Sequence, residues 1–146
     1  MAKVNRIGFE KAGSYKNIQG EVILVENIFS VDYEQLLSLG VERLVFDYDG
    51  TLSSKWNALP ANAVIELLLE LQKDFEITIY SNNWIFWKKR RKFFSASNIT
   101  YVKTQKPFRF EDDGEMNTVI IGDKWFTDRI YAWRRHWGCV LVGKSA

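Results

Sequence analysis

The feature that most constrains the fold is an apolar run that ends in two aspartates and a glycine, Leu44-Val45-Phe46-Asp47-Tyr48-Asp49-Gly50-Thr51-Leu52. Its branched and aromatic residues favour a buried β-strand, and Gly50 permits the sharp turn that would end it. Side chains two residues apart in a strand point to one side, so Asp47 and Asp49 are expected to begin on the same face. Asp-Gly is also common in hairpin turns, so the run alone leaves a simple turn as the alternative.

Strand and helix patterns alternate along the rest of the chain. Strand patterns lie at 21–28, 42–48, 75–80, 99–102, 117–121 and 139–142, and helical patterns lie at 32–40, 60–71, 84–97 and 126–137. Such alternation is typical of parallel βαβ units, so we expect an α/β fold with three layers and a mostly parallel sheet. Residues 1–20 show no periodicity and are expected to be a tail or irregular edge, with 21–146 forming a single domain.

Composition excludes several classes of protein. The net charge is only +2, so the chain as a whole is not a polycation built for nucleic acid, which makes a nucleic-acid partner an unfavoured interpretation. Cys139 is the only cysteine, which excludes an intramolecular disulfide and a cysteine-based metal site. No apolar stretch has the length of a membrane span or a signal peptide, so we expect a cytoplasmic, reducing location.

Polar residues follow four of the predicted strands. Because the carboxyl ends of parallel strands meet at one edge of a sheet, these residues should gather there. We expect that edge to hold four aspartates, a hydroxyl group and at least one lysine. The residues are Asp47 and Asp49 at the end of the strand at 42–48, Ser81-Asn82-Asn83 after 75–80, Lys103-Thr104-Gln105-Lys106-Pro107 after 99–102, and Gly122-Asp123 with Thr127-Asp128 after 117–121.

Each of these residue types has a function at a phosphate site. A carboxylate can accept a phosphoryl group, and a second carboxylate can protonate the leaving oxygen and later deprotonate water. Further carboxylates bind Mg²⁺, while a hydroxyl group and a lysine can hold the phosphoryl oxygens. Taken singly, Asp128 could pair on a helix surface, Asn82-Asn83 could form a turn and Lys106 could be solvated. Their occurrence at successive strand ends favours catalysis.

These motifs resemble those of the haloacid dehalogenase-like (HAD) hydrolase superfamily. The first motif is Asp47-Tyr48-Asp49-Gly50-Thr51-Leu52, the second is Ser81-Asn82-Asn83, the third is Lys106-Pro107 and the fourth is Gly122-Asp123-Lys124-Trp125-Phe126-Thr127-Asp128. More narrowly, the chain is similar to the IIIA-type phosphatases of the YqeG family, which are related to phosphatidylglycerophosphate phosphatases. The match covers about residues 28 to 143. The resemblance implies a Rossmann-like sheet with the first motif on its central strand.

The resemblance also implies a role for each motif residue. Asp47 would be the nucleophile and a Mg²⁺ ligand, and Asp49 would be the general acid and base and offer its backbone carbonyl to the metal. Ser81 and Lys106 would contact the phosphoryl group. Asn82, Gly50 and Thr51 would contribute to phosphate binding, and Asp123 and Asp128 would complete the metal site. The implied activity is Mg²⁺-dependent hydrolysis of a phosphomonoester through an aspartyl-phosphate.

The sequence departs from the YqeG pattern in two features, and the second of them leaves an alternative open. The first motif has Asp-Gly-Thr where YqeG relatives more often have Asp-Asn-Thr. The connection between Lys106 and Gly122 is short, and it contains the acidic loop Glu111–Glu115 where relatives usually have a helix. This short connection favours the alternative of a catalytically weak protein that binds a phosphorylated partner. Phosphoryl transfer to an acceptor other than water is a second enzymatic alternative.

The segments between the motifs are too short for a large cap domain, so we expect an open site that suits a lipid or another large phosphorylated substrate. The second motif is followed by Trp84–Phe94, which combines aromatic residues with five consecutive bases. This composition is typical of peripheral contact with an anionic membrane. The alternative, which we favour for the aromatics, is that Trp84, Trp87 and Phe94 pack inward, with Arg91 interrupting their stripe. The bases are then expected to attract an anionic substrate.

Overall fold

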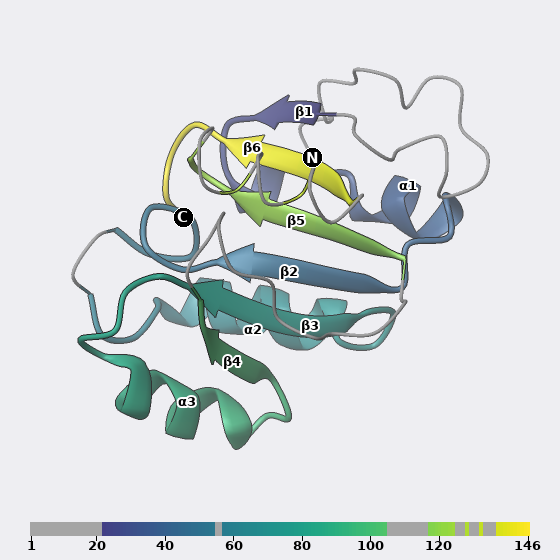
Figure 1. Cartoon of the computed structure of the whole chain (residues 1–146). Coiled ribbons are helices and arrows are strands. Elements are labelled where there is room, and N and C mark those ends of the chain that lie inside the picture. Colours follow the sequence, from purple (N-terminus) through teal and green to yellow (C-terminus); the bar gives the residue numbers. More distant parts are fainter. Residues whose placement is uncertain (1–21, 55–56, 105–116, 125–127, 129–131, 133–136) are drawn as a thin grey trace.

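The computed structural model describes residues 22–54, 57–104, 117–124, 128, 132 and 137–146. Within these residues six strands form one sheet in the order β1-β6-β5-β2-β3-β4, and every pairing is parallel (Figure 1). The strands are β1 Val22–Val25, β2 Arg43–Asp47, β3 Glu76–Ser81, β4 Thr100–Lys103, β5 Thr118–Gly122 and β6 Gly138–Val142. The fold is therefore α/β, as the alternation predicts.

Three α-helices and one 3₁₀ turn connect the strands in the described part of the chain. They are η3 Ile28–Ser30, α1 Tyr33–Ser38, α2 Asn62–Leu71 and α3 Trp87–Ser95. All six predicted strands and the first three predicted helices are present, with boundaries that differ by at most three residues. The predicted tail at 1–20 and most of the predicted helix at 126–137 lie outside the described residues.

The ends of α1 follow from the sequence. The Asp32 carboxylate accepts a hydrogen bond from the Gln35 backbone N–H at 3.1 Å, which satisfies one of the free donors of the first turn. Gly40 has a φ of +86°, the left-handed conformation that glycine adopts without strain after a helix. None of the helices in the described residues has the length and apolar character that a bilayer crossing requires.

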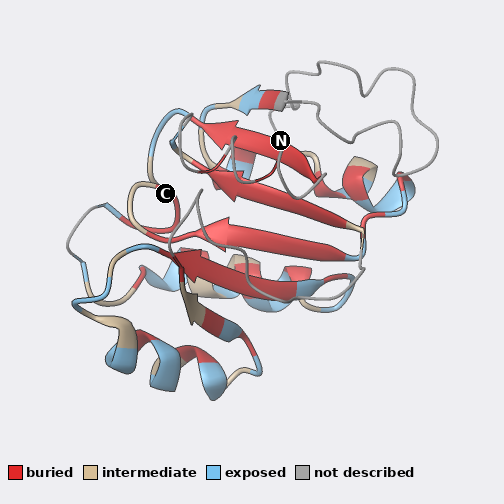
Figure 2. Ribbon diagram, viewed as in Figure 1, coloured by how far each residue is buried: buried red, intermediate tan, exposed pale blue. Residues whose placement is uncertain are grey.

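Both faces of the sheet are buried. Leu44 and Phe46 of β2 belong to a large core cluster that also contains residues from all three helices, and Val45 belongs to a second cluster with Ala132 and Trp137. Figure 2 shows the central strands as continuously buried, in contrast to the half-exposed helices. Burial on both faces explains why these strands are apolar throughout rather than alternating.

The order of the strands defines where a ligand can bind. From β2 the chain passes through α2 to β3 and through α3 to β4, and then returns to the other side of β2 to form β5 (Figure 1). Strands β3 and β4 thus lie on one side of β2, and β5 and β6 lie on the other. The carboxyl ends of β2 and β5 therefore flank the point at which the strand order reverses. In open α/β sheets this position holds the ligand crevice.

Candidate active site

Three carboxylates converge where β2 and β5 end. Asp47 is the last residue of β2, Asp123 directly follows β5, and Asp128 lies shortly after it. One carboxylate oxygen from each residue lies within 4.8 Å of the others. Asp47 and Asp128 are buried and Asp123 is half-buried, so their mutual repulsion is only weakly screened by solvent. Such a cluster favours the binding of a cation.

Two glycines provide the space that this cluster occupies. A Cβ atom at Gly122 would overlap the carboxylate of Asp128, and a Cβ atom at Gly50 would overlap the carboxylate of Asp123. Gly50 also has a φ of +84°, so a side chain there would be strained in addition. The glycines of the first and fourth motifs are thus required by the close approach of the backbone to the carboxylates.

The hydrogen bonds of the cluster support a hard cation as its ligand. Lys124 donates its backbone N–H to Asp128 Oδ2 at 3.1 Å, and the Thr51 hydroxyl makes a long 3.5 Å contact with Asp47 Oδ2. Asp123 Oδ1 is buried and accepts no hydrogen bond from any described residue. A buried carboxylate oxygen without a donor is costly, and Mg²⁺ would satisfy it because Mg²⁺ prefers carboxylate ligands. The three side chains therefore fit a magnesium site.

Asp49 does not join these carboxylates, although we expected it to share a face with Asp47. Strand β2 ends at Asp47, so the alternation of side chains no longer applies two residues later. The Asp49 carboxylate instead accepts hydrogen bonds from both terminal nitrogens of Arg90, at 3.1 and 3.2 Å. The prediction that the Asp49 backbone carbonyl binds the metal stays a prediction.

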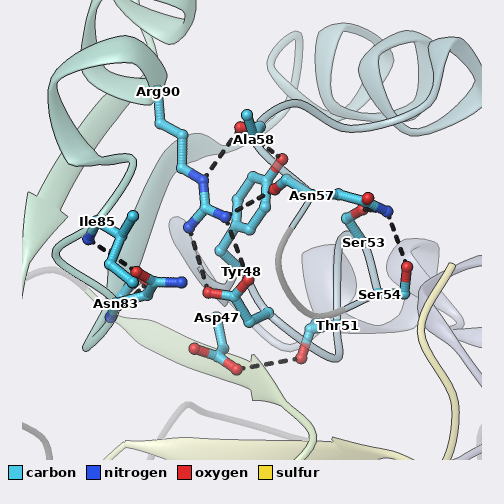
Figure 3. Close-up of polar contacts among 12 residues, drawn as sticks. Asp47, Tyr48, Thr51, Ser53, Ser54, Asn57, Ala58, Asn83, Ile85 and Arg90 are labelled. Carbon is cyan, nitrogen blue, oxygen red and sulfur yellow. Dashed lines mark hydrogen bonds and ion pairs between the residues drawn. The ribbon is translucent and has the colours of Figure 1, made fainter.

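Arg90 is the residue that the sequence analysis missed. It lies on α3, its side chain is 0% exposed, and Figure 3 shows it extended toward the segment that follows β2. Its guanidinium stacks on the Tyr48 ring, with Cζ 3.7 Å from the ring centroid. Burial alone would lower the pKa of Arg90, but hydrogen bonds to Asp49 and Tyr101 and the Asp49 charge raise it overall. Arg90 therefore stays cationic, which balances the charge of Asp49.

Tyr48 links the same groups. Its hydroxyl donates to the backbone carbonyl of Ala58 at 3.2 Å, and its ring packs edge-on against Phe94 of α3 and Tyr101 of β4. Burial raises the pKa of the Tyr48 phenol well above its ordinary value, and the positive charge of Arg90 opposes this only in part. The phenol therefore remains a hydrogen-bond donor and helps hold the loop at 57–58.

The second motif lies beside Asp47. Tyr80 pairs in register with Asp47, so Ser81 stands one residue further along the neighbouring strand, and it is buried. The Ser81 hydroxyl accepts a hydrogen bond from the Asn83 backbone N–H at 3.1 Å. Asn82 is exposed, and its side-chain oxygen accepts from the Thr104 hydroxyl at 2.7 Å. Asn82 and Asn83 thus form a turn that holds Ser81 at the edge, so the turn and the functional interpretation are compatible.

Some predicted site residues lie outside the described residues. These are Gln105, Lys106 and Pro107 at the third motif, Thr127 of the fourth motif and the acidic loop 111–115. The predicted contact of Lys106 with the phosphoryl group stays a prediction.

The prediction that Trp84, Trp87 and Phe94 all pack inward is partly wrong. Helix α3 begins at Trp87, so Trp84 precedes it and is 49% exposed, whereas Phe94 is buried. The base that interrupts the buried face is Arg90, and Arg91 is exposed. Residues 90 and 94 are one helical turn apart, so the spacing to Phe94 is the sequence signal that identifies Arg90 once the start of the helix is known.

Comparison with known proteins assigns nothing further to this site. No protein-family model, no curated protein and no solved structure matches the chain.

Proposed function

We propose that the protein is a Mg²⁺-dependent phosphatase of the HAD superfamily, most similar to the YqeG family, with a three-layer Rossmann-like fold and no large cap domain. The observation that carries the proposal is the convergence of the Asp47, Asp123 and Asp128 carboxylates at the point where strand order reverses. The buried Asp123 Oδ1, which accepts no hydrogen bond from a described residue, supports a cation as the missing partner.

Asp47, Asp123 and Asp128 would hold the Mg²⁺. When bound, the ion would offset the repulsion between an anionic nucleophile and an anionic phosphoryl group. Ser81 would then orient the phosphoryl oxygens from the neighbouring strand end, since its hydroxyl keeps a donor while its oxygen accepts from Asn83. Gly50 and Thr51 follow the nucleophile, and their backbone N–H groups donate to the carbonyls of Ser53 and Tyr48, so they would contribute by holding the turn beside the phosphate.

The chemistry needs two displacements at phosphorus. In the first, a carboxylate oxygen of Asp47 forms a bond to phosphorus while the ester P–O bond breaks, and Asp49, in a protonated form that interrupts its ion pair with Arg90, gives its proton to the leaving alcohol oxygen. In the second, Asp49 takes a proton from water, the water oxygen attacks phosphorus, and the bond between phosphorus and Asp47 breaks. Asp47 is regenerated as a carboxylate, Asp49 as an acid, and inorganic phosphate leaves.

The surface beside the site favours an anionic substrate or surface. Residues 82–104 contain no acidic side chain, and the exposed bases of α3 are Lys88, Lys89, Arg91 and Lys92. Trp84 and Ile85 are 49% and 66% exposed at the start of this segment. We therefore propose a lipid or other large phosphomonoester as the substrate, with peripheral contact with an anionic membrane through residues 84–92.

The proposed activity is tested by measuring Mg²⁺-dependent phosphate release from a panel of phosphomonoesters, including phosphatidylglycerophosphate. Asp47→Asn should lower the rate by at least about 10³-fold, because an amide is a poor nucleophile. Chelation of Mg²⁺ should have a similar effect. A folded protein that releases no phosphate from any substrate would exclude the phosphatase and favour binding of a phosphorylated partner.

The membrane contact has a separate test. Co-sedimentation with vesicles containing anionic phospholipid should be lost in Trp84→Ala/Ile85→Ala and weakened by high salt, because both the apolar and the charged parts contribute. Vesicles of neutral lipid are the control. Equal sedimentation with both kinds of vesicle, or with neither at low salt, would exclude the contact.

A further inference from the structure

All five N–H donors of Arg90 are engaged. Nε donates to the Ala58 carbonyl at 3.1 Å, Nη1 donates to Asp49 and to the Tyr101 hydroxyl, and Nη2 donates to Asp49 and to the Asn57 carbonyl. The distances span 2.7–3.2 Å, which is the normal range for N–H···O bonds. A guanidinium has no further donors. Arg90 is also 0% exposed, so it has no free donor to offer a substrate.

The acceptors belong to three separate parts of the site wall. Asp49 follows the nucleophile, Asn57 and Ala58 belong to the loop before α2, and Tyr101 lies on β4. Arg90 therefore joins the segment that carries the proposed acid and base to the loop beside it and to the neighbouring strand. Figure 3 shows the Arg90 guanidinium and its contacts with Asn57 and Ala58.

We propose that Arg90 is the positioning residue of Asp49: its guanidinium fixes the orientation of the Asp49 carboxylate relative to Asp47, and catalysis depends on that orientation although Arg90 does not contact the substrate. This inference rests on the proposed function. The planar fork of arginine is needed because it bonds both oxygens of Asp49 at once. A lysine at the same position has the charge but only three donors around one nitrogen, so it cannot make the five bonds.

The test compares Arg90→Lys with Arg43→Lys. Arg43 is also buried, but it lies at the opposite end of β2, where its Nε donates to Thr118. Making the same change at both positions distinguishes two effects. One is the loss of the guanidinium that bonds Asp49, and the other is the general effect of replacing a buried arginine. With a soluble phosphomonoester, Arg90→Lys should lower kcat by about 10²-fold and change KM by less than about two-fold, because the acid and base acts after substrate has bound. Arg43→Lys should leave both parameters near wild type.

Arg90→Ala adds a readout that a purely structural role would not produce. Millimolar guanidinium should restore part of the lost kcat, because it can occupy the vacated position and bond Asp49 in the same way. Ammonium at equal ionic strength should not restore it. If Arg90→Ala does not fold, Arg90→Lys carries the test. A folded Arg90→Lys with wild-type kcat would overturn the proposal, as would a change confined to KM.

A stability measurement keeps this inference separate from the proposed function. Unfolding midpoints in urea are compared for Arg90→Lys, Asp49→Asn and the double variant. If Arg90 holds Asp49, the double variant should lose much less stability than the sum of the two single losses. Additive losses would overturn the proposal even in a protein that releases no phosphate. If the wild type releases no phosphate and the losses are non-additive, the proposed phosphatase activity and the role of Arg90 in catalysis would be overturned. The contact between Arg90 and Asp49 would still be supported.

Discussion

Asp47 and Asp49 stand two residues apart and have opposite surroundings. Asp47 faces two other carboxylates, Asp123 and Asp128, within a 4.8 Å cluster. Asp49 faces a buried guanidinium that bonds both of its oxygens. The carboxylates around Asp47 favour an added cation, whereas the charge of Asp49 is already balanced within the protein.

The difference arises from where β2 ends. Asp47 is still part of the strand, so its side chain is directed by the sheet toward the strand end that carries Asp123. Asp49 lies beyond the strand, in a turn closed by the hydrogen bond from the Gly50 N–H to the Ser53 carbonyl at 2.7 Å. The same two-residue spacing therefore provides one carboxylate for a metal and one that is held ready for proton transfer.

The largest effect on stability is expected from removing the negative charge of Asp49. Asp49→Asn should lower the free energy of unfolding by about 3 kcal/mol, because it leaves the buried Arg90 cation without a counter-charge. Urea unfolding measures the loss. Asp74→Asn, at an exposed position, is the control and should have little effect. A loss at Asp49 no larger than at Asp74 would show that the ion pair does not stabilise the fold.

A smaller effect on stability is expected from crowding the cluster of carboxylates around Asp47. Gly122→Ala should cost about 2 kcal/mol and weaken the response to Mg²⁺, because the new Cβ would displace the Asp128 carboxylate. Gly40→Ala is the matched control. It is strained by a φ of +86°, at about 1 kcal/mol, but a Cβ there would make only an ordinary contact with the Asn117 side chain, and Gly40 lies far from the cluster along the sheet. Thermal unfolding with and without Mg²⁺ separates the two. An unaltered Mg²⁺ response in Gly122→Ala would contradict the placement of Asp128 at the metal.

The smallest effect on stability is expected to be an increase rather than a loss. In the presence of chelator, Asp123→Asn should stabilise the protein by about 1 kcal/mol, because it removes one charge from the cluster. Added Mg²⁺ should stabilise the wild type progressively and the variant hardly at all, since only the wild type keeps all three ligands. The readout is the unfolding midpoint at several Mg²⁺ concentrations. Destabilisation by Asp123→Asn in chelator would mean that the carboxylates do not repel one another there.

The sequence predicted most of the fold because its patterns are local. Apolar runs such as Val119–Ile121 act over a few residues, and so does the hydrogen bond between Asp32 and Gln35 that begins α1, so strands and helices lie where the local patterns indicate. The meeting of Asp47 with Asp123 could also be predicted, because parallel strands bring their carboxyl ends to one edge.

The partner of Asp49 could not be predicted from the sequence. Arg90 lies 41 residues away in a run of five bases, where any of the five could have faced inward. Which one does so depends on the start of α3 at Trp87 and on how that helix packs against β4. Both are results of tertiary packing, which neither periodicity nor composition specifies.

The most direct test of the central proposal is to trap the phosphorylated aspartate. Protein that is denatured during turnover with Mg²⁺ and substrate is reduced with borohydride, which converts an aspartyl-phosphate to homoserine, and the modified residue is located by mass spectrometry. We expect homoserine at position 47 in the wild type, and none in Asp47→Asn or in protein denatured after chelation of Mg²⁺. Phosphate release without modification at position 47, or with modification at another residue, would contradict the assignment of Asp47 as the nucleophile.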